Sequence, residues 1–137
     1  MNASVSEALV SQVDLLSSLA SLVGSDARGT DSEVLLGVLM GQSSEGRKEL
    51  ILEATSRNAL RKGDWILIPP YQGPAVAKQV KIELGNALAY QLYNLSEDMG
   101  EQNNLVKSNP EKLKEMIATF KEIRREGYRE LQQLELK

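Results

Sequence analysis

The residue types that carry most enzymatic chemistry are missing from this sequence. Its 137 residues contain no Cys and no His. Thiol nucleophiles, disulfides, zinc sites and imidazole bases are therefore excluded from these residues. What remains for chemistry is a small set of carboxylates, lysines and aromatic rings.

Three carboxylates lie close together in the sequence, at Glu97, Asp98 and Glu101. Such a group could bind a metal ion or work as an acid and a base, but its spacing matches no calcium loop. Residues 96–102 are of turn-forming types, and we interpret the carboxylates as part of a solvated turn. The sequence thus assigns no catalytic, cofactor-binding or metal residue.

Other features could bind a ligand or carry a modification, and each has a simpler interpretation. Lys78 and Lys81 flank a loop that could approach an anion, but isolated loop lysines are usually solvated. Trp65 falls in a predicted strand, where it suits a core anchor better than a ligand platform. Residues 2–4 and 94–96 fit the glycosylation pattern, which is too common to be informative.

Composition predicts one ordinary globular domain. Hydrophobic residues make up 42% and charged residues 26%, and the net charge is -3. The basic residues are dispersed, which argues against nucleic acid as a partner. The apolar runs are far shorter than the roughly 20 residues that span a bilayer, so no membrane segment is expected.

Helical periodicity marks the first 41 residues. An apolar stripe predicts a helix over residues 5–23 that ends at Gly24. Asp31 or Ser32 could cap a second, short helix that ends before Gly41. The first helix is more apolar than one small sheet needs, so part of its surface is expected to face another domain. The residues concerned are Leu15, Leu16, Leu19, Leu22 and Val23.

Short strands are predicted next, over residues 49–54, 58–61, 65–68 and 89–95. A hairpin turn at residues 62–64 joins the second strand to the third. The pair Pro69 and Pro70 ends the third strand. Residues 69–86 show no clear period, and they read as a long loop or an excursion around residues 80–84.

A long amphipathic helix is predicted to close the chain. Ser108 or Asn109 caps it, Pro110 lies in its first turn, and its apolar positions continue to Leu134. Gly127 is expected to bend or weaken it.

These elements predict an α+β fold in which a small four-stranded antiparallel sheet packs against the C-terminal helix, with one or two N-terminal helices. Residues 1–137 are expected to form a single domain, with a helical segment at 1–41 and the sheet and last helix at 42–137.

Three stretches, in this order and spacing, carry a resemblance to a known family. They are residues 10–19 (VSQVDLLSSL), 59–68 (ALRKGDWILI) and 91–105 (QLYNLSEDMGEQNNL). They resemble the patterns V-D-L-x-P-T-L, R-x-G-D-W-K-L-I and L-Y-D/N-L-x-x-D-P-x-E-x-x-N-L of the sulfatases, the alkaline-phosphatase-like hydrolases of sulfate esters. Residues 31–41 and 85–86 are similar to further family patterns. The resemblance thus covers nearly the whole chain and implies a C-terminal subdomain.

The sequence departs from these patterns at several positions. Ser17 and Ser18 replace the usual Pro and Thr, Ile66 stands where Lys is common, and Met99 stands where Pro is frequent. The fold that the resemblance implies is a four-stranded antiparallel sheet packed by a long helix, which agrees with the fold read from the residues.

The family's catalytic groups cannot be placed on this sequence. The resemblance implies, for the parent enzyme, a formylglycine made from Cys or Ser in Cys/Ser-x-Pro-x-Arg and a calcium ion held by Asp and Asn. Residues 108–112 imitate that motif only superficially, because Lys112 stands in place of Arg and the segment forms a helix cap. No catalytic residue is transferred, and the nucleophile and calcium site are expected upstream.

The leading hypothesis is a bacterial sulfatase C-terminal fragment that supports the catalytic domain, its expected partner, and is inactive alone. Residues 69–86 could lend a loop to the rim of the substrate cleft. The sulfate-ester substrate, an aryl sulfate or a sulfated glycan, would meet only the full enzyme, whose expected location by resemblance is periplasmic or secreted.

An alternative is a free-standing protein-interaction module that uses the apolar first helix, which could also form a dimer. A third hypothesis is a complete small enzyme, which the absence of Cys and His disfavours.

Overall fold

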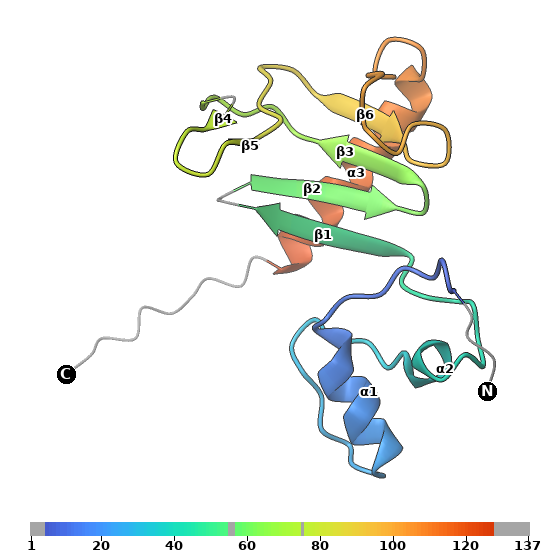
Figure 1. Cartoon of the computed structure of the whole chain (residues 1–137). Helices are drawn as coiled ribbons and strands as arrows, with labels where there is room; N and C mark the ends of the chain where they lie inside the picture. The colour runs from blue at the N-terminus through green and yellow to red at the C-terminus, as the bar shows by residue number, and fades with distance from the viewer. Residues whose placement is uncertain (1–4, 55–56, 75, 128–137) are drawn as a thin grey trace. The chain divides into compact units, whose positions relative to one another are not determined.

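The computed structural model describes residues 5–54, 57–74 and 76–127 of the chain. It forms two compact units that divide between Leu50 and Ile51. We call residues 1–50 the helical unit and residues 51–137 the sheet unit, and Figure 1 shows the elements of each. The single domain expected from the sequence stays a prediction.

The helical unit contains α1 (Asp14–Leu22) and the single-turn α2 (Leu36–Leu39). The prediction that the first helix begins at residue 5 is wrong. The carbonyl oxygen of Leu9 accepts a hydrogen bond from the backbone N–H of Arg47 at 2.8 Å, so this part of the backbone pairs with a distant segment and not with a helical turn. Gly24, with a φ of 72°, follows the end of α1 as predicted.

The second helix also begins later than the sequence predicts. Asp31 has a φ of 61°, which is not a helical conformation, and the Oγ of Ser32 accepts a hydrogen bond from Ser17 N. Neither residue therefore caps α2, which begins at Leu36. None of the helices among the described residues is both long enough and apolar enough to cross a membrane.

The four predicted strands form one antiparallel sheet. They are β1 (Glu49–Ala54), β2 (Arg57–Lys62), β3 (Trp65–Ile68) and β6 (Gln91–Asn94), in the order β1-β2-β3-β6. The register pairs Leu60 with Leu67 and Leu67 with Leu92, which places these three side chains on one face. Gly63 turns the hairpin between β2 and β3 with a φ of 58°.

The region predicted as a loop or an excursion contains a second, smaller sheet. Here β4 (Val76–Ala77) pairs antiparallel with β5 (Ile82–Glu83). These strands of two residues each form a hairpin between β3 and β6. We call residues 69–86 the hairpin arm.

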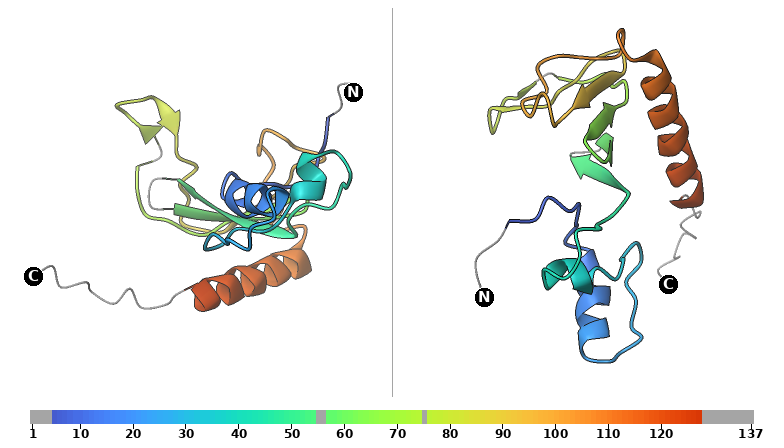
Figure 2. Two further views of the ribbon diagram at one scale, coloured as in Figure 1. Left: turned by 90° about the horizontal axis from the view of Figure 1, so that it is seen from below. Right: turned by 90° about the vertical axis from the view of Figure 1, so that its right-hand side faces the viewer.

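The last helix, α3 (Pro110–Gly127), lies along one face of the four-stranded sheet, as Figure 2 shows. Leu60, Leu67 and Leu92 of the sheet and Met116 of the helix form a fully buried core. Trp65 packs against this core, which confirms its interpretation as an anchor. The predicted continuation of the apolar positions to Leu134 falls on residues 128–137, which lie outside the described residues.

Candidate functional site

The two faces of α1 are placed in the reverse of the usual arrangement. Its buried residues are Asp14, Ser17 and Ser18, each at most 1% exposed. Their spacing of three and four residues puts them on one side of the helix. The exposed large side chains of α1 and its end are apolar: Leu15, Leu16, Leu19, Leu22 and Val23.

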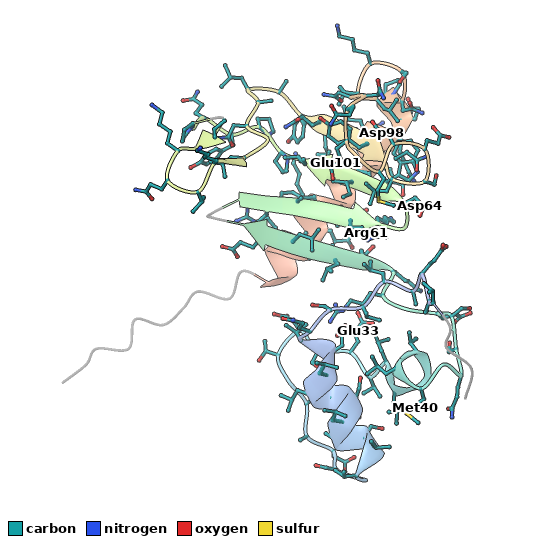
Figure 3. The ribbon with its side chains drawn as sticks, viewed as in Figure 1. Glu33, Met40, Arg61, Asp64, Asp98 and Glu101 are labelled. Carbon is teal, nitrogen blue, oxygen red and sulfur yellow. The ribbon has the colours of Figure 1, made fainter. Side chains whose placement is uncertain are left out.

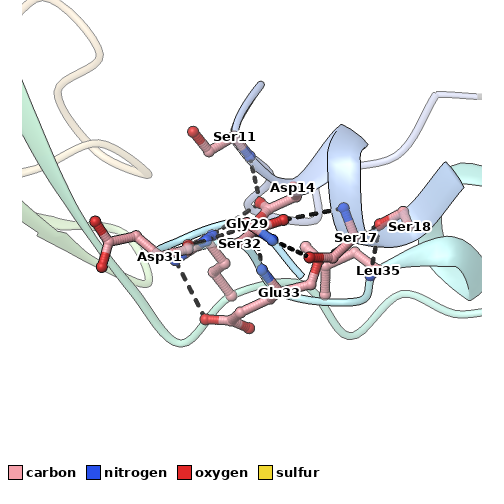
Figure 4. Close-up of polar contacts among 10 residues, drawn as sticks. Ser11, Asp14, Ser17, Ser18, Gly29, Asp31, Ser32, Glu33 and Leu35 are labelled. Atoms are coloured by element: carbon pink, nitrogen blue, oxygen red, sulfur yellow. Dashed lines mark hydrogen bonds and ion pairs between the residues drawn. The ribbon is translucent and has the colours of Figure 1, made fainter. Parts of the chain in front are cut away.

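Asp14 is the centre of the buried polar face. Its carboxylate accepts hydrogen bonds from the backbone N–H groups of Ser11 and Glu33, each at 2.9 Å. The guanidinium of Arg47 meets the same carboxylate with two donors, Nε at 2.8 Å and Nη2 at 2.5 Å. Arg47 also donates to the carbonyl oxygen of Asp31 and forms an ion pair with Glu33. Most of these contacts are drawn in Figure 4.

The two serines extend this network along the helix. Ser17 N donates to Ser32 Oγ, and Ser17 Oγ accepts from the N–H of Gly29, both at 3.2 Å. Ser18 Oγ accepts from the N–H of Leu35 at 2.9 Å. We call Asp14, Ser17, Ser18 and Arg47, with the backbone of residues 29–35, the polar cluster (Figure 4). It ties the segment between the helices to α1.

Charge pairing sets the protonation state of the cluster. The hydrogen bonds from Arg47 lower the pKa of Asp14 to about 2, although burial opposes this shift. The same pairing raises the pKa of Arg47 above its ordinary value. Both oxygens of Asp14 are engaged by backbone and guanidinium donors. A carboxylate held in this way suits a structural role better than that of a general base.

The carboxylates at residues 97–101 lie on the loop after β6, where Figure 3 labels two of them. Asp98 accepts a hydrogen bond from Asn103 N at 2.6 Å and thereby closes the turn. Burial, followed by the charge of Asp98, raises the pKa of Glu101. Burial, followed by the charges of Glu101 and Asp98, raises the pKa of Tyr93. The turn interpretation therefore accounts for Asp98.

No group of three or more acidic side chains is placed to hold a metal ion within the described parts of the chain.

The same loop covers the outer edge of β6. Asn104 Oδ1 accepts from the N–H of Leu92 at 3.2 Å, and Leu105 N donates to the carbonyl oxygen of Leu92 at 2.8 Å. An exposed sheet edge is prone to pair with other chains, and these bonds protect it. The family pattern in residues 91–105 therefore has a structural explanation.

The segment at residues 108–112 begins α3 as predicted. The carbonyl oxygen of Asn109 accepts the N–H of Leu113 at 3.0 Å, and Pro110 is the first helical residue. Ser108 Oγ donates to the carbonyl oxygen of Leu105 at 3.1 Å. Lys112 pairs with Glu115 and lies over the ring of Trp65.

The remaining candidates are dispersed. Lys78 and Lys81 are exposed, and both lie on the turn that connects β4 to β5. Asn94, in the second glycosylation pattern, accepts hydrogen bonds from the N and Oγ of Ser96. Residues 2–4 lie outside the described residues.

The polar cluster is the feature that the sequence analysis missed. The signal was present, because Asp14, Ser17 and Ser18 are polar residues at helical spacing. The apolar stripe on the other side of the helix dominated the prediction. The contribution of Arg47 could not be foreseen, because it is 33 residues away from Asp14 in the sequence.

No protein-family model matches the chain. An N-acetylgalactosamine-6-O-sulfatase of Bacteroides thetaiotaomicron is 34% identical over an alignment of 122 residues, and the match covers 86% of this chain and 24% of that protein. The chain is related to the C-terminal subdomain of the sulfatases.

A solved structure supports the same relationship. It comes from a study of the metabolism of multiple glycosaminoglycans by Bacteroides thetaiotaomicron, and it matches with a TM-score of 0.80 and 34% identity. The match covers 86% of this chain and 25% of that one. The chain therefore spans about a quarter of the sulfatases that it matches.

Proposed function

We propose that this chain is the C-terminal subdomain of a sulfatase, a sulfuric ester hydrolase, and that it supports the catalytic part without carrying the reaction. The chain lacks Cys and His. The segment around Ser108 forms the start of α3, and the hydroxyl of Ser108 donates to the carbonyl oxygen of Leu105. The nucleophile and the metal site of the parent would come from the remaining three quarters of the enzyme.

The orientation of α1 carries this proposal. The helix buries its polar face in the polar cluster, and it leaves Leu16 58%, Leu19 53% and Leu22 55% exposed. Burying one such side chain fully contributes about 1.5–3 kcal/mol, so a row of them is a strong docking surface. We call Leu15, Leu16, Leu19, Leu22 and Val23 the apolar face of α1. The occupant that we propose for it is the catalytic part of the same protein.

The names of the relatives support a proposal about the substrate class. One is named for a sulfate on N-acetylgalactosamine, and the other comes from work on glycosaminoglycans. We therefore propose a sulfated glycan, and not an aryl sulfate, as the substrate of the parent enzyme.

The purified chain tests the docking surface directly. Light scattering after size exclusion should show self-association, and a hydrophobic dye should bind strongly, because the apolar face of α1 lacks its partner. Changing Leu16 and Leu19 to Ser should reduce both signals. The matched control is Leu52→Ser, which removes an apolar side chain that is 42% exposed on β1. A monomer that binds little dye would contradict the proposal.

The same preparation tests the absence of activity. It should release no sulfate from N-acetylgalactosamine 6-sulfate or from an aryl sulfate. Sulfate release by the chain alone would overturn the assignment as a supporting subdomain.

A free-standing interaction module is the second candidate, because an exposed apolar helix suits a protein partner equally well. The native gene separates the two. A reading frame that encodes Cys-x-Pro-x-Arg upstream of this sequence would support the sulfatase, and one that begins near Met1 would support the module.

A further inference from the structure

The sheet unit contains a cavity that none of the roles above uses. Its volume is about 130 Å³. It lies at the base of the hairpin arm, where the chain leaves β3 and returns towards β6, and it extends to β2 and to the later turns of α3. The residues that give it its chemistry are Asn58, Pro70, Tyr71, Asn86, Phe120 and Arg124.

Asn86 is the polar residue that indicates a missing partner. Its Nδ2 donates to the carbonyl oxygen of Pro74. Its Oδ1 is buried and has no hydrogen-bond partner among the described residues. Buried acceptors are almost always paired, and one that is left over beside a cavity calls for a donor from a water or a ligand. Asn58 brings a second amide to the same cavity.

The other walls are apolar rings with one cation. Pro70, Tyr71 and Phe120 offer flat surfaces that suit the C–H face of a small ring. Arg124 is exposed, and its guanidinium carbon lies 5.7 Å from the centre of the Phe120 ring. A guanidinium held over an aromatic ring is well placed to pair with a planar or tetrahedral anion.

We propose that this cavity binds a single sugar unit that carries an anionic group. A sugar hydroxyl donates to Asn86 Oδ1, the ring lies against the apolar walls, and the anion pairs with Arg124. The cavity is smaller than the roughly 300–1,000 Å³ of pockets for drug-sized ligands, so it holds one unit or the charged end of a longer chain. The choice of a sulfated sugar as the first probe rests on the proposed function.

Titration of the isotope-labelled chain, followed by NMR, tests this site. With N-acetylgalactosamine 6-sulfate, the signals of the Gly85 amide and the Asn86 side chain should move, while those of Leu67 and Leu92 in the core should stay. Arg124→Gln should weaken binding about tenfold, because a charge-assisted hydrogen bond is lost. Lys121→Gln is the matched control, because it removes an exposed positive charge from α3 outside the cavity.

Further probes and one more variant make the result decisive. Asn86→Ala should also weaken binding, and unchanged core signals would show that it folds. Glucuronate distinguishes a carboxylate from a sulfate ester as the bound anion, and binding of either sugar supports the site. If neutral N-acetylgalactosamine binds as well as the charged sugars, if inorganic sulfate binds as well as they do, or if no signal moves, the proposal is wrong. Such a failure would leave the dye-binding test of α1 unaffected.

Discussion

Asp14 and Arg47 form a nearly buried ion pair, with side-chain exposures of 2% and 9%. Removing one partner leaves the other charge buried and unpaired, which typically costs 3–5 kcal/mol. We expect Asp14→Asn to destabilise the helical unit by about 3 kcal/mol. Urea unfolding followed by the NMR signals of Glu33 and Leu35, whose amides the polar cluster holds, measures this loss.

A double-mutant cycle separates the ion pair from other effects of the substitution. Arg47→Gln should also destabilise, and the double variant should lose less stability than the sum of the two single losses. Additive losses would mean that the two side chains act independently.

The pH dependence of stability follows from the same carboxylate. The pKa of Asp14 is about 2 in the folded chain, against an ordinary value of 3.8, so the unfolded chain takes up the proton first as pH falls. The pair therefore contributes its full stability, about 2 kcal/mol, above about pH 5 and loses it between about pH 4 and pH 2. Unfolding at a series of pH values checks this. Asp14→Asn should remove this part of the pH dependence, and an unchanged acid profile in that variant would contradict the assignment.

The hydrogen bond of Ser18 tests the polar cluster at a position where no charged group is involved. Its Oγ accepts from the buried N–H of Leu35, and Ser18→Ala would leave that donor unpaired. The expected loss is about 1–2 kcal/mol, read as faster hydrogen exchange at Leu35. Ser21→Ala, at an exposed position of the same helix, is the control and should have little effect. Equal effects of the two would show that the hydrogen bond contributes nothing.

At the scale of elements, the sequence predicted the sheet and the last helix well. The strands at residues 49–54 and 65–68 have the predicted bounds. The turn at Gly63 and the pair Pro69 and Pro70 mark the two ends of the second of these strands. The β4 and β5 strands were not predicted as strands, since two residues each are too few to show an alternating pattern.

The first helix shows what periodicity cannot provide. Its apolar spacing was found, and part of that apolar surface was expected to face another domain, but the spacing alone does not show that the opposite, polar face is the buried one. In α1 the polar face is buried and the apolar face is exposed. The face that α1 buries is set by its contacts with Arg47 and with residues 29–35. These residues are distant from α1 in the sequence, so a local pattern does not contain them.

The packing of α3 on the sheet gives a prediction for the other unit. Met116 is fully buried against Leu60, Leu67 and Leu92. Met116→Ala should destabilise the sheet unit by about 3 kcal/mol, through lost burial and the cavity left behind. The fluorescence of Trp65, the only Trp, reports unfolding of this unit. Lys114→Ala, at an exposed position of the same helix, should change stability little. A small loss for Met116→Ala would place the core elsewhere.

At the scale of the whole molecule, the chain accounts for about a quarter of its sulfatase relatives. Several residues of the stretches that resemble the sulfatases have structural roles within this chain. Asp14 anchors α1, Gly63 turns a hairpin, and Asp98 closes the loop after β6. The resemblance could be recognised from sequence because turns and buried polar contacts demand particular residue types at fixed spacing.

We propose that the apolar face of α1 docks this subdomain onto a sulfatase catalytic part. The most direct test replaces the matching quarter of the Bacteroides N-acetylgalactosamine-6-O-sulfatase with this chain and measures sulfate release. We predict an active chimera that loses activity when Leu16 and Leu19 are changed to Lys and keeps it when Leu52 is changed to Lys. A soluble chimera without activity, or one whose activity survives the change of Leu16 and Leu19, would contradict this docking role of α1.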